Sequence, residues 1–109
     1  MNYMDIVYED FIPERVAQLR KAKGVSARDM SLSIGQNPSY INRIENKRNL
    51  PSLCGLLYIC DYLKITPRQF FDVESQNPAK LNAIIADLEK LDGDALAHIA
   101  GIVQSLAKK

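Results

Sequence analysis

The chain has 109 residues, a formal net charge of +1, 47% hydrophobic residues and 25% charged residues. This composition is typical of one small globular unit, or of one domain with an appendage. No apolar run approaches the roughly 20 residues that cross a bilayer, and residues 1–10 are acidic without an apolar core. Neither a membrane span nor a signal peptide is therefore expected, and the sequence predicts a cytoplasmic protein.

The charges are unevenly distributed along the chain. Residues 1–13 hold three acids and no base, whereas residues 14–71 hold ten Lys and Arg against four acids, a net +6. Residues 72–109 have a net charge of −2. A positive excess on one segment is what phosphate binding requires, although an excess of this size also fits an ordinary solvated surface.

The first predicted elements are two helices separated by glycine. One helix is predicted over residues 13–23, and Gly24 ends it in the left-handed conformation. A second helix begins at Ser26, where Asp29 three residues later completes a capping-box pattern. Gly35 then forms a tight turn to the next helix.

A third, short helix is predicted to begin at Asn37, with Pro38 in its first turn. The second and third helices direct these apolar residues at one core: Met30, Ile34, Ile41 and Ile44. The opposite face of the third helix is polar and carries Ser39, Asn42, Arg43 and Asn46. The DNA major groove admits a short helix with a buried back and a hydrogen-bonding front.

Two further helices complete the central region. A polar loop over residues 46–51 leads to Ser52, which caps a fourth helix. The predicted buried side of this helix holds Leu53, Leu56, Leu57, Cys60 and Leu63. Residues 66–67 start a fifth helix, which brings Phe70 and Phe71 to the core.

The C-terminal part reads as a linker over residues 73–78 followed by two helices, over 80–91 and 94–107, with a turn at 92–93. Their apolar stripes have helical spacing. The stripes are Leu81, Ile84, Ile85, Leu88 and Leu91 in the first, and Leu96, Ile99, Ile102, Val103 and Leu106 in the second. No alternating strand pattern occurs, so the predicted fold class is all-α.

Four stretches occur in order: RVAQLRKAKGVS at 15–26, YINRIE at 40–45, PSLCGLL at 51–57 and ITPRQFFD at 65–72. With them, residues 14–72 resemble the Cro/repressor-type helix-turn-helix domains of phage repressors and xenobiotic-response-element regulators. The resemblance implies a five-helix lambda-repressor-like domain over residues 12–72, with a recognition helix near 38–46. An acidic segment, residues 1–11, precedes it, and a two-helix hairpin, residues 79–109, follows the linker.

The resemblance also implies the residues that touch DNA. The base-contacting positions of the family fall on Pro38, Ser39 and Arg43, with Asn42 beside them. The phosphate-contacting positions fall on Asn37, Lys47 and Arg48. Arg20 and Glu45 stand where the family has an ion pair between the first and third helices, which fixes the angle of the recognition helix.

Two positions depart from the family pattern. Ala27 stands where the family usually has Gln, so Arg28 is the candidate for the missing phosphate contact. Pro38 replaces a long polar side chain and can only pack against a thymine methyl. Tyr40 has two interpretations: its hydroxyl supports a phosphate, or its ring covers the core beside Ile44.

The C-terminal stripes need a partner surface, because a hairpin with about a dozen residues in each helix is marginal alone. That surface is either the chain's own domain or the same hairpin of a second copy, in an antiparallel four-helix bundle. We favour the second copy, because a two-fold operator requires two reading heads about 34 Å apart. The predicted dimer interface is Leu81, Ile84, Leu88, Ile99, Ile102 and Leu106.

No catalytic constellation, phosphate-binding glycine loop or metal motif is found, so neither an enzyme nor a cofactor is expected. His98 lacks neighbours with metal spacing. Cys54 and Cys60, six residues apart on one helix, point to different faces, and we expect two unbridged core residues.

The leading interpretation is a sequence-specific regulator, a repressor that binds double-stranded DNA as a homodimer. One alternative is a helix-turn-helix protein-interaction module that has lost DNA binding. Its support is the low net charge together with Ala27 and Pro38. Another is an antitoxin-type repressor, whose hairpin binds a partner protein.

Overall fold

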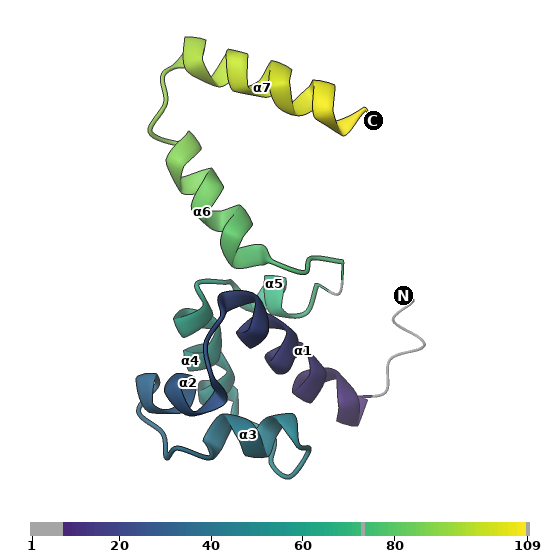
Figure 1. Ribbon diagram of the computed structural model, residues 1–109, viewed down its shortest axis with the longest axis vertical. Helices are drawn as coiled ribbons and strands as arrows, with labels where there is room; N and C mark the ends of the chain where they lie inside the picture. The colour runs from purple at the N-terminus through teal and green to yellow at the C-terminus, as the bar shows by residue number, and fades with distance from the viewer. Residues whose placement is uncertain (1–7, 73, 109) are drawn as a thin grey trace. The chain divides into compact units, whose positions relative to one another are not determined.

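The computed structural model describes residues 8–72 and 74–108, and this part of the chain is all-α, without strands. The helices are α1 (Tyr8–Lys23), α2 (Ala27–Ser33), α3 (Tyr40–Glu45), α4 (Leu53–Leu63), α5 (Pro67–Phe70), α6 (Pro78–Leu88) and α7 (Gly93–Ala107) (Figure 1). The chain divides into two compact units, the first ending at Ala79 and the second beginning at Lys80. Among these helices, none has the length and apolar character to cross a membrane.

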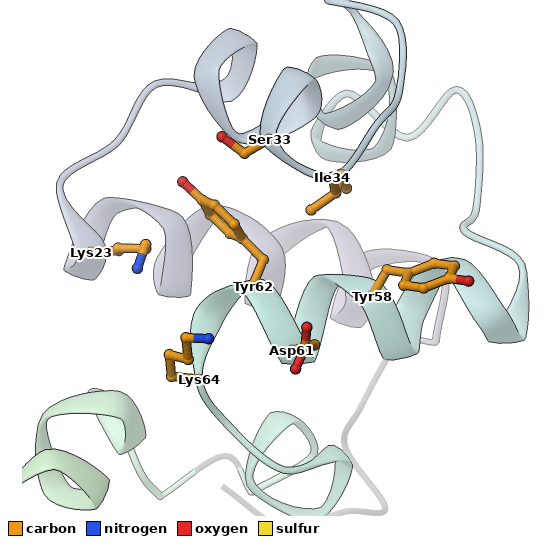
Figure 2. A pocket seen from close by; sticks show the side chains of 7 residues that line it. All are labelled: Lys23, Ser33, Ile34, Tyr58, Asp61, Tyr62 and Lys64. Carbon is orange, nitrogen blue, oxygen red and sulfur yellow. The ribbon is translucent and has the colours of Figure 1, made fainter.

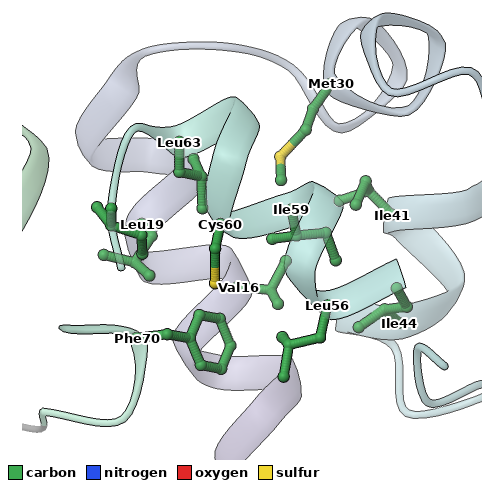
Figure 3. Packing of buried hydrophobic residues seen from close by; sticks show 11 residues of the cluster. Val16, Leu19, Met30, Ile41, Ile44, Leu56, Ile59, Cys60, Leu63 and Phe70 are labelled. Carbon is green, nitrogen blue, oxygen red and sulfur yellow. The ribbon is translucent and has the colours of Figure 1, made fainter. Parts of the chain in front are cut away.

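One hydrophobic core holds the first unit together. Figure 3 shows side chains from α1 to α5 meeting in this core, among them Val16, Met30 and Phe70, which are fully buried. The full cluster is Val16, Leu19, Met30, Ile41, Ile44, Leu56, Ile59, Cys60, Leu63, Ile65 and Phe70. Burial of each large apolar side chain contributes about 1.5–3 kcal/mol, so this cluster fixes how α3 packs on α1 and on α2.

Helix α1 begins at Tyr8, five residues before the predicted start. Phe11 stacks on Phe71, with ring centroids 5.8 Å apart and planes 10° apart, so packing stabilises the first turns. Pro13 is buried within the helix instead of opening it, and the predicted domain boundary between residues 11 and 12 lies inside α1. Residues 1–7 of the predicted acidic segment lie outside the described residues.

The predicted buried side of α4 is partly wrong. Leu53 is 76% exposed, Leu57 is 47% exposed and Cys54 is exposed. The core-facing stripe instead runs through Leu56 and the positions three, four and seven residues later, and Leu57 is rotated by about 100° from Leu56. Both cysteines are free thiols, but only Cys60 belongs to the core.

A buried arginine joins the end of α5 to α1, and the sequence interpretation missed it. Arg15 is only 3% exposed. Its Nε donates to the Phe70 carbonyl at 2.6 Å, and Nη2 donates to the carbonyls of Gln69 at 2.6 Å and Asp72 at 2.9 Å. Burial lowers the pKa of Arg15 from its ordinary value, and these carbonyls replace the lost water. The chain then leaves α5 with Phe71 half-exposed, not in the core as predicted.

Helix α6 begins at Pro78, inside the predicted linker, because Pro78 is buried and Ala79 packs on the core of the first unit. In the second unit, the Asp92 carboxylate caps α7 by accepting a hydrogen bond from the Ala95 amide at 2.8 Å. Helix α7 has no buried residue. If α6 and α7 packed on one another as a closed hairpin, their two apolar stripes would be buried. The residues of these stripes remain largely exposed, so the second unit is not a closed hairpin.

Candidate nucleic-acid interface

Helix α3 begins at Tyr40, later than predicted. Residues 37–40 form a turn in which the Tyr40 amide donates to the Asn37 carbonyl at 3.1 Å. The Asn37 Oδ1 accepts hydrogen bonds from the amide of Ser39 at 3.1 Å and from its hydroxyl at 2.9 Å. Asn37 therefore caps this turn, and its amide nitrogen remains the group suited to a phosphate oxygen.

A buried serine sets α3 against α2. The Ser31 hydroxyl donates to the Ala27 carbonyl at 2.7 Å and accepts from the Ile41 amide at 2.9 Å. The first amides of a helix lack partners within the helix, and Ser31 satisfies one of them. Sequence reasoning missed this residue, because a serine in the middle of α2 carries no signal of what it faces in space.

An ion pair holds the other end of α3. Arg20 Nε and Nη2 donate to the two oxygens of Glu45 at 2.6 and 2.9 Å, and Nη1 donates to the Val25 carbonyl at 2.9 Å. The hydrogen bond to Glu45 raises the pKa of Arg20 above its ordinary value. A bidentate pair constrains both distance and orientation, so α3 is fixed to the end of α1.

Ser31 and the Arg20–Glu45 pair hold the two ends of α3 against the domain. The opposite, exposed side of the helix carries polar side chains, and we call this side the polar front. Asn42 and Arg43 are exposed, and Ser39 is half-buried. The Asn46 amide nitrogen donates to the Asn42 amide oxygen at 2.8 Å across one helical turn. Pro38 is exposed in the turn that precedes the helix. The four side chains predicted to contact bases therefore lie on one continuous segment, residues 38–43. This segment comprises the end of the turn and the first residues of α3.

The candidate phosphate contacts flank this front. Lys47 has a positive φ of 63° and follows the end of α3. Its Nζ pairs with the Asp10 carboxylate on α1, and this contact raises the pKa of Lys47. Arg48 and, on α2, Arg28 are exposed. A phosphate that binds Lys47 must therefore compete with Asp10.

Tyr40 packs against the core cluster and is half-buried. Its hydroxyl lies close to the start of α4: a Cβ added to Gly55 would stand 2.6 Å from the Tyr40 oxygen. Burial raises the pKa of Tyr40. The ring thus covers the core, which is one of the two interpretations of this residue. The hydroxyl faces the junction between α3 and α4.

A groove of about 450 Å³ lies away from these residues (Figure 2). Its lining comes from α1, the end of α2 and α4, and none of it comes from α3. The Lys23 ammonium stands 5.0 Å from the centre of the Tyr62 ring beside it. The groove is therefore distinct from the polar front of α3.

This arrangement defines a helix-turn-helix DNA-binding domain: a short exposed helix is held across a preceding helix by buried contacts. A model of the family described as Helix-turn-helix, of the Cro/C1 type, matches residues 16–70, half of the chain. The chain belongs to this family of DNA-binding regulators. No curated protein and no solved structure matches the chain.

Proposed function

We propose that this protein is a sequence-specific regulator that binds double-stranded DNA as a homodimer and represses transcription by occupying a two-fold operator. The observation that supports this proposal is the exposed front of α3. Its polar side chains project from a helix held at one end by Ser31 and at the other by the Arg20–Glu45 pair. Such rigid placement is what base readout requires.

The side chains on this front have different roles. Arg43 suits a bidentate contact with guanine O6 and N7, and Asn42 suits an adenine edge or a phosphate. Ser39 contacts a base or phosphate, and Pro38 packs on a thymine methyl. The phosphate contacts are Arg28, Asn37, Tyr40, Lys47 and Arg48, which add affinity without sequence information.

The homodimer is supported by the second unit. Its predicted interface residues are mostly exposed within one chain: Leu81, Ile84, Ile99, Ile102 and Leu106 are between 37% and 62% exposed. Exposed apolar side chains gathered on two neighbouring helices are typical of an interaction site. A second copy would also supply the second reading head that a two-fold operator requires.

The test is a binding titration with DNA selected from a random pool. Arg43→Ala should cost about 1–3 kcal/mol on the selected site and relax preference at one base position. Arg48→Ala should weaken binding to all sequences alike and reduce the salt slope. If the wild-type protein binds no duplex at low salt, the chain is instead a protein-interaction module.

A further inference from the structure

The formal charges of the second unit are confined to the ends of its two helices. The turn end, residues 87–94, holds four acids and one lysine, a net charge of −3. The opposite ends of the two helices carry one described lysine each, Lys80 near the start of α6 and Lys108 after the end of α7, and we call these two ends together the open end. Between these ends, residues 81–86 and 95–107 contain no Asp, Glu, Lys or Arg.

The two ends are electrostatically separate. Helix α7 has 15 residues, which corresponds to a length of about 22 Å. This length exceeds the Debye length of about 8 Å at physiological ionic strength. A partner that lies along the helix therefore meets an acidic site at one end and a basic site at the other.

The uncharged middle of these helices carries large apolar side chains that remain exposed within one chain. Ile102 and Val103, which belong to the apolar stripe of α7, are 57% and 56% exposed. The remaining positions of α7 are mainly small, with alanine recurring and Gly101 at the centre. A helix with one apolar stripe normally buries that stripe against a partner surface.

We propose that the second unit pairs with the same unit of a second copy in the antiparallel sense, so that each acidic turn end lies beside the basic open end of its partner. This inference rests on the proposed homodimer and specifies its orientation. Charge complementarity identifies the partner as a second copy, because the −3 end and the lysines at the opposite end occur in one chain. The parallel arrangement would place two acidic ends together, which is unfavourable.

The test measures self-association of the full-length protein without DNA, by sedimentation equilibrium. Asp87→Lys/Glu89→Lys makes the turn end basic, and Lys80→Glu/Lys108→Glu makes the open end acidic. Because each substitution acts twice in a two-fold dimer, each double variant should dissociate about tenfold more readily. An equimolar mixture of the two variants should restore association, since opposite ends then meet again.

A change in self-association opposite in sign to the one expected would overturn the proposal. In a parallel dimer, Asp87→Lys/Glu89→Lys relieves repulsion and tightens self-association, and high salt tightens the wild-type dimer. A wild-type protein that stays monomeric at every concentration would also overturn it. In the antiparallel dimer, high salt weakens association of the wild-type protein, a measurement that requires no variant to fold.

The matched control is Glu14→Lys/Asp61→Lys, which makes the same change in net charge at exposed positions of the first unit. Its self-association should equal that of the wild-type protein, and a loss equal to that of Asp87→Lys/Glu89→Lys would refute the end-to-end pairing. A DNA titration on the same samples separates the two proposals. Absence of DNA binding with charge-dependent self-association contradicts the proposed function and supports the antiparallel pairing.

Discussion

The guanidinium of Arg20 forms two hydrogen bonds with the carboxylate of Glu45, and both side chains are largely buried, at 16% and 14% exposed. The same guanidinium donates to the Val25 carbonyl, just before α2. One side chain on α1 therefore contacts the end of α3 and the residue that precedes the cap of α2, so the orientation of α3 depends on a residue of α1.

We expect Glu45→Ala to lower the free energy of unfolding by about 3 kcal/mol, because it leaves a largely buried guanidinium without its charged partner. Urea unfolding monitored by circular dichroism measures this change. Glu14→Ala, an exposed acid on α1, is the control and should stay within about 0.5 kcal/mol of the wild-type protein. Equal stability of the Glu45 and Glu14 variants would show that the pair contributes little.

Ser31→Ala should lower the free energy of unfolding by about 1–3 kcal/mol, because the buried amide of Ile41 loses its acceptor. Thermal unfolding measures the loss. Ser33→Ala in the same helix removes an exposed hydroxyl and serves as the control. If both variants melt together, the contact between Ser31 and α3 does not stabilise the domain.

Asp10→Asn should strengthen DNA binding and steepen its salt dependence, because Lys47 then loses the carboxylate that competes with phosphate. Fluorescence anisotropy at several salt concentrations gives both quantities. Asp61→Asn makes the same change in net charge on α4, in the groove away from α3. Equal gains from the two variants would mean that net charge, and not release of Lys47, causes the effect.

Stability should fall in alkaline solution. Burial raises the pKa values of Tyr40 and Cys60 above their ordinary values of 10.0 and 9.0. The folded protein thus holds protons that the unfolded chain releases, so stability present below those values is lost as pH rises through the folded pKa values. Melting temperatures of Tyr40→Phe should fall less than those of the wild-type protein above about pH 10. Tyr58→Phe, at an exposed position, should follow the wild-type curve of melting temperature against pH. If the Tyr40→Phe curve also follows the wild-type curve, Tyr40 does not cause the alkaline loss of stability.

Most of the fold could be predicted from local signals. Gly24 and Gly35 have the positive φ that their positions suggested, and Ser26 and Ser52 cap their helices as predicted. Asp92 caps α7 at a place where only a turn was predicted. Caps and left-handed glycines depend on a few neighbouring residues, which a sequence displays directly. The start of α1 could not be predicted from neighbouring residues, because it depends on ring stacking between Phe11 and Phe71, which are sixty residues apart in the chain.

The sequence by itself determined the all-α class, the helix-turn-helix pattern and the polar front of α3, because helical periodicity and capping are local properties. Only the tertiary structure decided which polar groups meet: Ser31 with Ile41, Arg15 with the end of α5, and Lys47 with Asp10. It also decided that Leu53 and Leu57 face solvent. The physical reason is that burial and hydrogen-bond partners are set by how separate helices pack, and no spacing along one helix specifies its neighbour.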